Sequence, residues 1–162
     1  MNKIELKLID IWDMREAIKH FNEREDICFN AGIKFSRSAK KIMEEIRELN
    51  TYQQKLAREH DVAVPPTLKK GIPIDKDASI EVRENLEAKN KEINTENLKV
   101  AEEWKSRKTK ADEEWRHYLK TSDPVVMEVE KISISDVTDK DGNKINMLPK
   151  FSIPLGPLFK DE

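Results

Sequence analysis

The chain has 162 residues, of which 37% are hydrophobic and 38% are charged, and its mean hydropathy is -0.77. This balance is typical of long, solvent-exposed helices with one narrow apolar seam, and it argues against a globule buried on all sides. The 30 basic and 32 acidic residues nearly cancel, so no strong net field would draw the chain to nucleic acid or an anionic membrane.

The first residues, 1–6, do not form the apolar stretch of a signal peptide, and no stretch approaches the roughly 20 apolar residues of a membrane span. The single cysteine, Cys28, cannot form an internal disulfide, which fits a reducing compartment. We expect Cys28 to be a small buried hydrophobe rather than a reactive thiol. The sequence therefore predicts a cytoplasmic protein without membrane contact, folded as one domain over residues 1–162.

The N-terminal part predicts a strand and two helices. Alternating apolar residues predict a half-buried strand over residues 3–9. Asp10 then stands at the N-cap position of a helix over about residues 11–24. A second helix is predicted over about residues 35–60, with Ser36 or Ser38 as its cap. Its apolar residues step by three and four, as in a coiled-coil seam: Phe35, Ala39, Ile42, Ile46, Leu49, Gln53, Leu56 and His60.

The linker over residues 62–78 cannot be helical throughout, because Pro65, Pro66, Gly71 and Pro73 interrupt it. Loops of this length are often functional. Its apolar residues favour a linker that packs along the helices, and a recognition loop is the alternative.

The third helix is predicted over about residues 79–120, with a kink near Asn94 and Thr95, where Thr95 could cap a new helix. Asn90 and Asn97 lie on its seam. Either they are buried and fix the register, as in coiled coils, or this half of the helix faces solvent. The full seam is Leu86, Asn90, Ile93, Asn97, Val100, Trp104, Ala111, Trp115 and Tyr118.

The β segment and apolar tail occupy residues 124–162. Alternation predicts a strand at 125–129 with a bulge near Glu130, a turn at 141–143 and a returning strand at 145–147. The tail, residues 152–159, is apolar and interrupted by prolines, so we expect it to dock on the core or on a partner.

Assembled, these elements predict a predominantly helical α+β fold. It is a long antiparallel helical hairpin that carries a small antiparallel sheet, formed by the N-terminal and C-terminal strands. The seams of the second and third helices pair within the chain, because the linker is long enough for a hairpin. Pairing between two copies, a homo-oligomer, is the alternative.

Each pattern that could indicate catalysis, a cofactor or a metal lacks a required second element. Glu114 and His117 have the spacing of a di-iron ligand pair, but the second pair and two further glutamates are absent. The sequence around Asp139 places its glycine too early for a calcium loop and predicts a turn. Cys28 has no oxyanion loop, and the four glycines are too scattered to hold phosphate. We predict a non-enzymatic protein without cofactor or metal.

The best candidate for nucleic-acid contact is the basic segment 105–110 between two tryptophans. Acidic residues bracket it, which is typical of a solvated, salt-bridged face. Nucleic-acid binding through this segment is therefore the alternative function and not the main prediction.

Trp104 and Trp115 lie 11 residues apart, so both rings fall on one stripe of the third helix. They either pack in the core or anchor a partner, because Trp and Arg dominate interface hot spots. The predicted partner-binding residues are Trp104, Trp115, Arg116, Tyr118, Leu155, Leu158 and Phe159.

The order of these pieces resembles a family of small tailed-phage proteins of uncharacterised function. The matching stretches are residues 14–18, 35–46, 114–119, 129–136 and 155–162. The linker and third helix are longer here than in that family. The resemblance implies a phage gene product in an infected bacterium or in the virion, and it transfers no catalytic residue. We therefore predict a phage-encoded protein-binding module, either a virion or assembly component or an inhibitor of a host or defence protein.

Overall fold

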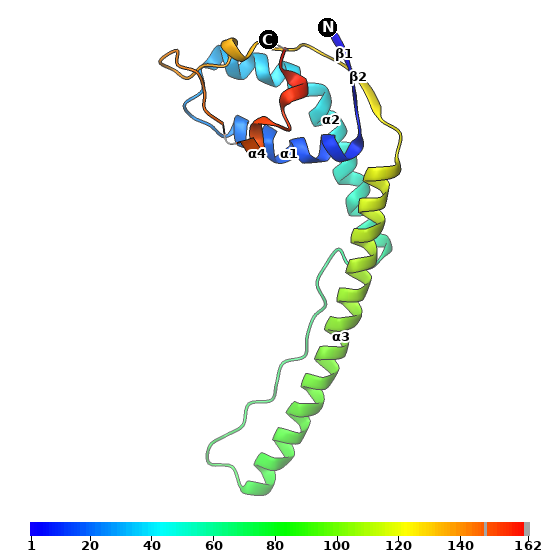
Figure 1. Cartoon of the computed structure of the whole chain (residues 1–162). Helices are drawn as coiled ribbons and strands as arrows, with labels where there is room; N and C mark the ends of the chain where they lie inside the picture. The colour runs from blue at the N-terminus through cyan, green and yellow to red at the C-terminus, as the bar shows by residue number, and fades with distance from the viewer. Residues whose placement is uncertain (148, 161–162) are drawn as a thin grey trace. The chain divides into compact units, whose positions relative to one another are not determined.

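The computed structural model describes residues 1–147 and 149–160. Its elements are β1 (Asn2–Leu6), α1 (Leu8–Asn22), α2 (Phe29–Glu59), α3 (Ile80–Thr121), β2 (Val125–Val129), the 3-10 helix η1 (Ile134–Asp136), α4 (Pro149–Ser152) and the 3-10 helix η2 (Gly156–Leu158) (Figure 1). The sequence predicts one domain, whereas contacts within the chain define two compact units. Unit 1 comprises Met1–Gln53 and Arg116–Glu162, and unit 2 comprises Gln54–Trp115. The acidic end of the tail, residues 161–162, lies outside the described residues.

A two-stranded antiparallel sheet joins the start of the chain to the segment after α3. Asn2 of β1 lies opposite Val129 of β2, and Leu6 lies opposite Val125. The small antiparallel sheet is therefore confirmed, but β2 lies well before the C-terminus. The predicted first strand was too long, because Leu8 already begins α1. The predicted returning strand at 145–147 is wrong, since this part of the described chain forms no strand.

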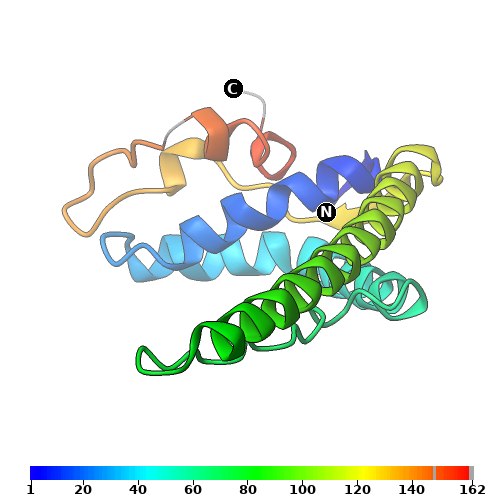
Figure 2. The same ribbon diagram turned by 90° about the horizontal axis from the view of Figure 1, so that it is seen from below.

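The core of unit 1 lies between α1 and α2, where the Phe21 and Phe35 rings stack with centroids 3.7 Å apart. Figure 2 shows α1 between α2 and the C-terminal segment. Both helices begin earlier than predicted. Asp10 lies in the first turn of α1 and does not cap it, since the N-cap is Lys7. Ser36 and Ser38 lie inside α2.

The apolar tail belongs to this core. Leu155 and Leu158 are fully buried, and Ile132 forms an isolated parallel bridge with Phe159. The Phe151 ring of α4 stacks on His20 of α1, with centroids 4.0 Å apart. Of the two places expected for the tail, the core is the one the structure shows.

Unit 2 consists of the end of α2, the linker and most of α3. α2 ends in a Schellman motif, in which Asp61 has a φ of 54° and Val62 N–H donates to the Ala57 carbonyl at 2.7 Å. Residues 62–78, which we call the strap, then run back along α3 without forming a helix (Figure 1). Within unit 2, the strap therefore takes the place that the predicted hairpin gave to a second long helix.

α3 is one continuous helix, and its predicted bounds were correct to within one residue. The predicted kink near Thr95 is absent, because the Thr95 hydroxyl donates back to the Lys91 carbonyl at 2.9 Å and caps no new helix. None of the described helices is long and apolar enough to cross a membrane.

Ser38 is a buried polar residue in the unit 1 core, and its Oγ has no hydrogen-bond partner in the described part of the chain. An unsatisfied buried hydroxyl costs stability. We therefore expect Ser38→Ala to raise the free energy of unfolding by about 1 kcal/mol, measured by urea denaturation. Ser36→Ala, at an exposed site on the same helix, should show only the smaller gain from helix propensity, about 0.5 kcal/mol or less. A loss of stability in Ser38→Ala would contradict this account.

Candidate binding site

Two asparagines of α3 hold the backbone of the strap. Asn97 accepts from the Lys69 N–H at 2.9 Å and donates to the Lys69 carbonyl at 2.8 Å. Asn90 accepts from the Ile72 N–H at 2.6 Å and donates to the Ile72 carbonyl at 2.9 Å. Each side-chain amide thus satisfies both backbone groups of one strap residue. The hydrogen bonds fix the path of the strap without involving the side chains of Lys69 or Ile72.

Two further side chains extend this row in both directions. Trp104 Nε1–H donates to the Val64 carbonyl at 3.2 Å, and the Arg83 guanidinium donates to the Lys76 carbonyl. Lys69 also forms a salt bridge with Glu96. We call the four residues that bind the strap backbone the clamp: Arg83, Asn90, Asn97 and Trp104.

The clamp residues follow one another at intervals of seven along α3. Seven helical residues advance by about 10.5 Å. The two asparagines bind strap residues three apart, and three residues of a polyproline II chain advance by about 9.3 Å with a period of three. Two amides seven residues apart on a helix can therefore bind two residues that lie three apart on an extended chain.

The sequence reveals part of this arrangement. An extended segment cannot satisfy its own N–H and C=O groups, so they need partners elsewhere. Asn90 and Asn97 were expected either to be buried and fix register or to face solvent. The structure shows a third arrangement, in which both are half-buried and bind the strap backbone. The sequence signal that indicates these contacts is the seven-residue spacing of two asparagines, together with a neighbouring segment that contains several prolines.

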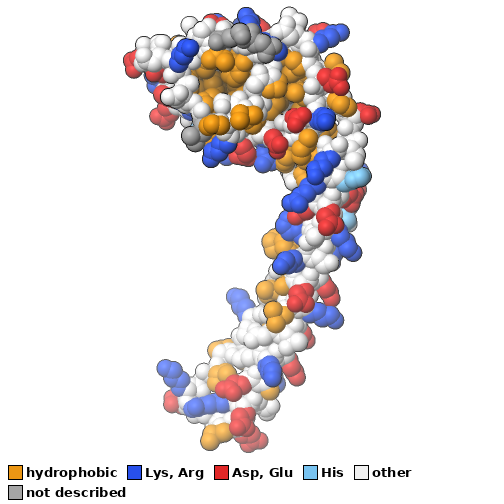
Figure 3. All heavy atoms as spheres, viewed as in Figure 1, with side chains coloured by type: hydrophobic (Ala, Val, Ile, Leu, Met, Phe, Trp, Pro, Cys, Tyr) orange, Lys and Arg blue, Asp and Glu red, His pale blue; other side chains and the backbone are white. Residues whose placement is uncertain are grey.

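The strap presents four large apolar side chains to solvent although its backbone is held. Val64 is 75% exposed and Leu68 is 47% exposed, and Ile72 and Ile74 are also exposed. On α3 itself the exposed apolar residues are Ile80, Val82, Leu98 and Val100. Figure 3 shows hydrophobic side chains among the charged ones along this unit. Eight of the thirteen exposed large hydrophobic residues that the structure describes thus lie in unit 2.

The structure places the predicted partner-binding residues in different environments. Trp104 is half-buried under the strap, and Trp115 is buried. In unit 1, Arg116 is exposed and Tyr118 contacts Tyr52 with ring centroids 4.2 Å apart.

The three tail residues do not form an exposed anchor. Leu155 and Leu158 are fully buried and Phe159 is half-buried. Their side chains pack in the unit 1 core, and most of the exposed large hydrophobic residues lie on the strap and α3 instead.

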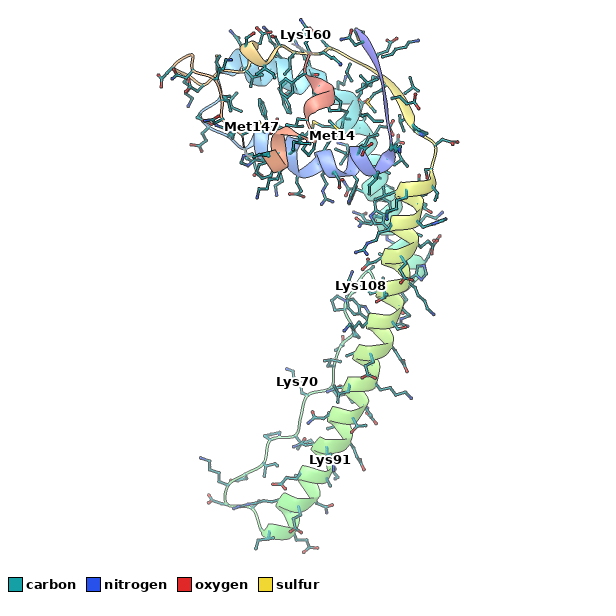
Figure 4. All side chains as sticks on the ribbon, viewed as in Figure 1. Met14, Lys70, Lys91, Lys108, Met147 and Lys160 are labelled. Atoms are coloured by element: carbon teal, nitrogen blue, oxygen red, sulfur yellow. The ribbon has the colours of Figure 1, made fainter. Side chains whose placement is uncertain are left out.

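Part of the basic segment 105–110 is paired with acidic residues. Arg107 lies 3.6 Å from Asp61, and Lys108 lies 3.3 Å from Asp112. Figure 4 labels Lys108 on α3 and Lys70 on the strap. The paired charges match the solvated, salt-bridged face that the sequence predicts.

The two metal patterns are explained by other interactions. Glu114 binds His60 Nε2 at 2.7 Å. Asp139 forms the predicted turn: its carboxylate accepts from Asn143 N–H at 2.8 Å and Asp141 N–H at 2.9 Å. The backbone hydrogen bond from Asn143 is the main reason that the pKa of Asp139 is lowered. Within residues 1–147 and 149–160, no group of three or more His, Cys, Asp or Glu side chains could hold a metal.

Cys28 lies beside a cavity of about 540 Å³ at the start of α2. It is half-buried, so the expectation of a buried residue is met only in part. The lining residues include Phe21, Arg24 and Arg37 but no His, Asp or Glu. The described lining therefore offers the thiol no imidazole or carboxylate as a general base.

A scan against protein-family models, a search of curated proteins and a search of solved structures found no match to this chain.

Removing either asparagine should release one point of the strap. We expect Asn97→Ala to speed hydrogen exchange of the Lys69 amide, and Asn90→Ala that of the Ile72 amide, by about fivefold each. This corresponds to a local loss of about 1 kcal/mol for exposed hydrogen bonds. Exchange measured by NMR, amide by amide, tests both.

Asn94→Ala is the matched control, because Asn94 is exposed on the same helix and lies outside the clamp. It should leave both amides unchanged. Equal acceleration in all three variants would show that the clamp does not control the exchange, because Asn→Ala only raises the helix propensity of α3.

Proposed function

We propose that this chain is a phage-encoded, non-enzymatic protein-binding module, and that the strap is the segment it presents to its partner. The observation that carries the proposal is the clamp, which holds the strap backbone while its apolar side chains stay exposed. The phage origin is supported by the resemblance in the order and spacing of the elements. The partner is a virion protein during assembly or a host or defence protein that the chain inhibits.

The clamp favours a binding role for a physical reason. A flexible loop loses conformational entropy when it docks, which weakens binding. The strap is already fixed at Val64, Lys69 and Ile72, so a partner would gain the burial of its apolar groups at a smaller entropic cost. Extended proline-containing segments are common ligands because they need little further ordering.

The test is affinity purification of the tagged full chain from phage-infected bacteria, with mass spectrometry of both virions and lysate. We expect the wild type to enrich one protein, and the double variant Val64→Asp/Leu68→Asp to reduce that enrichment at least about tenfold. Two charges would then replace the most exposed apolar groups of the strap. Enrichment from virions supports an assembly role, and enrichment from lysate alone supports inhibition.

Ile153→Asp is the matched control, because Ile153 is 74% exposed but lies in unit 1. It should enrich the same protein as the wild type. Enrichment of no protein by the wild type, or equal enrichment by the strap variant, would overturn the proposal.

A further inference from the structure

One side of α3 carries an exposed row of residues that the strap leaves open. Ile80 is 76% exposed and Leu98 is 65% exposed. They lie 18 residues apart, which is about five helical turns, so they project from the same side. Leu98 follows Asn97 directly and therefore lies about 100° around the helix from that clamp residue. Between them lie four exposed polar residues at helical spacing: Glu84, Glu87, Lys91 and Asn94.

We propose that this side of α3, which we call the pairing face, binds a second copy of this chain in antiparallel orientation. In an antiparallel dimer whose two-fold axis passes beside residue 89 of both helices, Ile80 lies opposite Leu98 of the second copy. The same arrangement also places Glu84 opposite Asn94 and Glu87 opposite Lys91. Every position of the row thus meets a complementary group, apolar with apolar and acid with amide or base. A surface that matches itself in this way is the requirement of a two-fold dimer.

The charges select this arrangement over a parallel one. In a parallel pair each residue of the row would face its own copy, so Glu87 would meet Glu87 and Lys91 would meet Lys91. Like charges in contact destabilise a complex. No salt bridge engages Glu87 or Lys91 within the described part of the chain, so both remain available to the second copy (Lys91 is labelled in Figure 4).

The other exposed apolar pair on α3 does not match itself. Val82 and Val100 are also 18 residues apart, about 160° around the helix from Ile80 and Leu98. An antiparallel pair centred between them would place Leu86 opposite Glu96 and Lys89 opposite Ile93, which buries charges against apolar groups. The pairing face is therefore the self-complementary one. It does not include the strap, so dimerisation does not depend on the proposed function.

The test measures oligomeric state of the full chain by sedimentation equilibrium over a concentration series. We expect a concentration-dependent dimer for the wild type. Glu87→Lys and Lys91→Glu each place like charges opposite each other at both symmetry-related positions, and each should weaken the dimer about tenfold. The double variant Glu87→Lys/Lys91→Glu should restore it. An equimolar mixture of the two single variants should form heterodimers, because every reversed charge then meets an opposite one.

The mixture separates pairing between chains from i,i+4 attraction within one helix. Each single variant places like charges at 87 and 91 of its own helix, and mixing the two variants cannot change that. Leu98→Glu should also dissociate the dimer, while Val100→Glu, on the other side of the helix, should not. Circular dichroism confirms that each variant keeps its helix content. A wild type that stays monomeric up to about 1 mM, or single variants that no mixture rescues, would overturn the proposal.

Discussion

The backbone of an extended chain cannot satisfy its own hydrogen-bonding groups, and this constraint governs unit 2. The strap meets it through the clamp, in which Asn90 and Asn97 each bind both backbone groups of one strap residue. Because the hydrogen bonds come from one stripe of α3, the strap must follow that stripe. Its apolar side chains are then left exposed, and so are the sides of α3 that the strap does not cover. The candidate binding surfaces both follow from this arrangement.

The sequence predicted the limits of α3 and of the strap well, because prolines and a long helical period are strong local signals. The sequence did not correctly predict which segment packs on the seam of α3, where the strap lies in place of a second helix. An apolar stripe at helical spacing shows that a helix has a contact side, but it does not show whether a helix or an extended chain lies there. A second helix would have buried Asn90 and Asn97 without partners for their amides, whereas the strap offers each amide a matching N–H and C=O.

In unit 1 the sequence correctly predicted an N-terminal strand. It left the tail to dock on the core or on a partner, and the structure shows the core. The sequence misjudged the start of α2, because Phe29 is exposed and adds no periodic signal to the first turn. Two of the predicted binding residues of the tail are not accessible to a partner, because Leu155 and Leu158 are buried in the core. Tertiary contacts decide which apolar residues of a short segment are buried, and these contacts cannot be predicted from the residue types alone.

The clamp also limits how the length of this region can vary. Removing one residue between Asn90 and Asn97 would turn one of the two amides about 100° away from the strap. A single insertion or deletion in α3 or in the strap therefore breaks the hydrogen bonds between the two segments. Between the two asparagines, a change that preserves the register must add or remove seven residues of helix together with three of the strap. The neighbouring steps of the clamp pair seven helix residues with five strap residues, from Val64 to Lys69, or with four, from Ile72 to Lys76. Lengthening or shortening of unit 2 should therefore occur in coupled blocks of about ten to twelve residues, divided between two segments that are separate in the sequence.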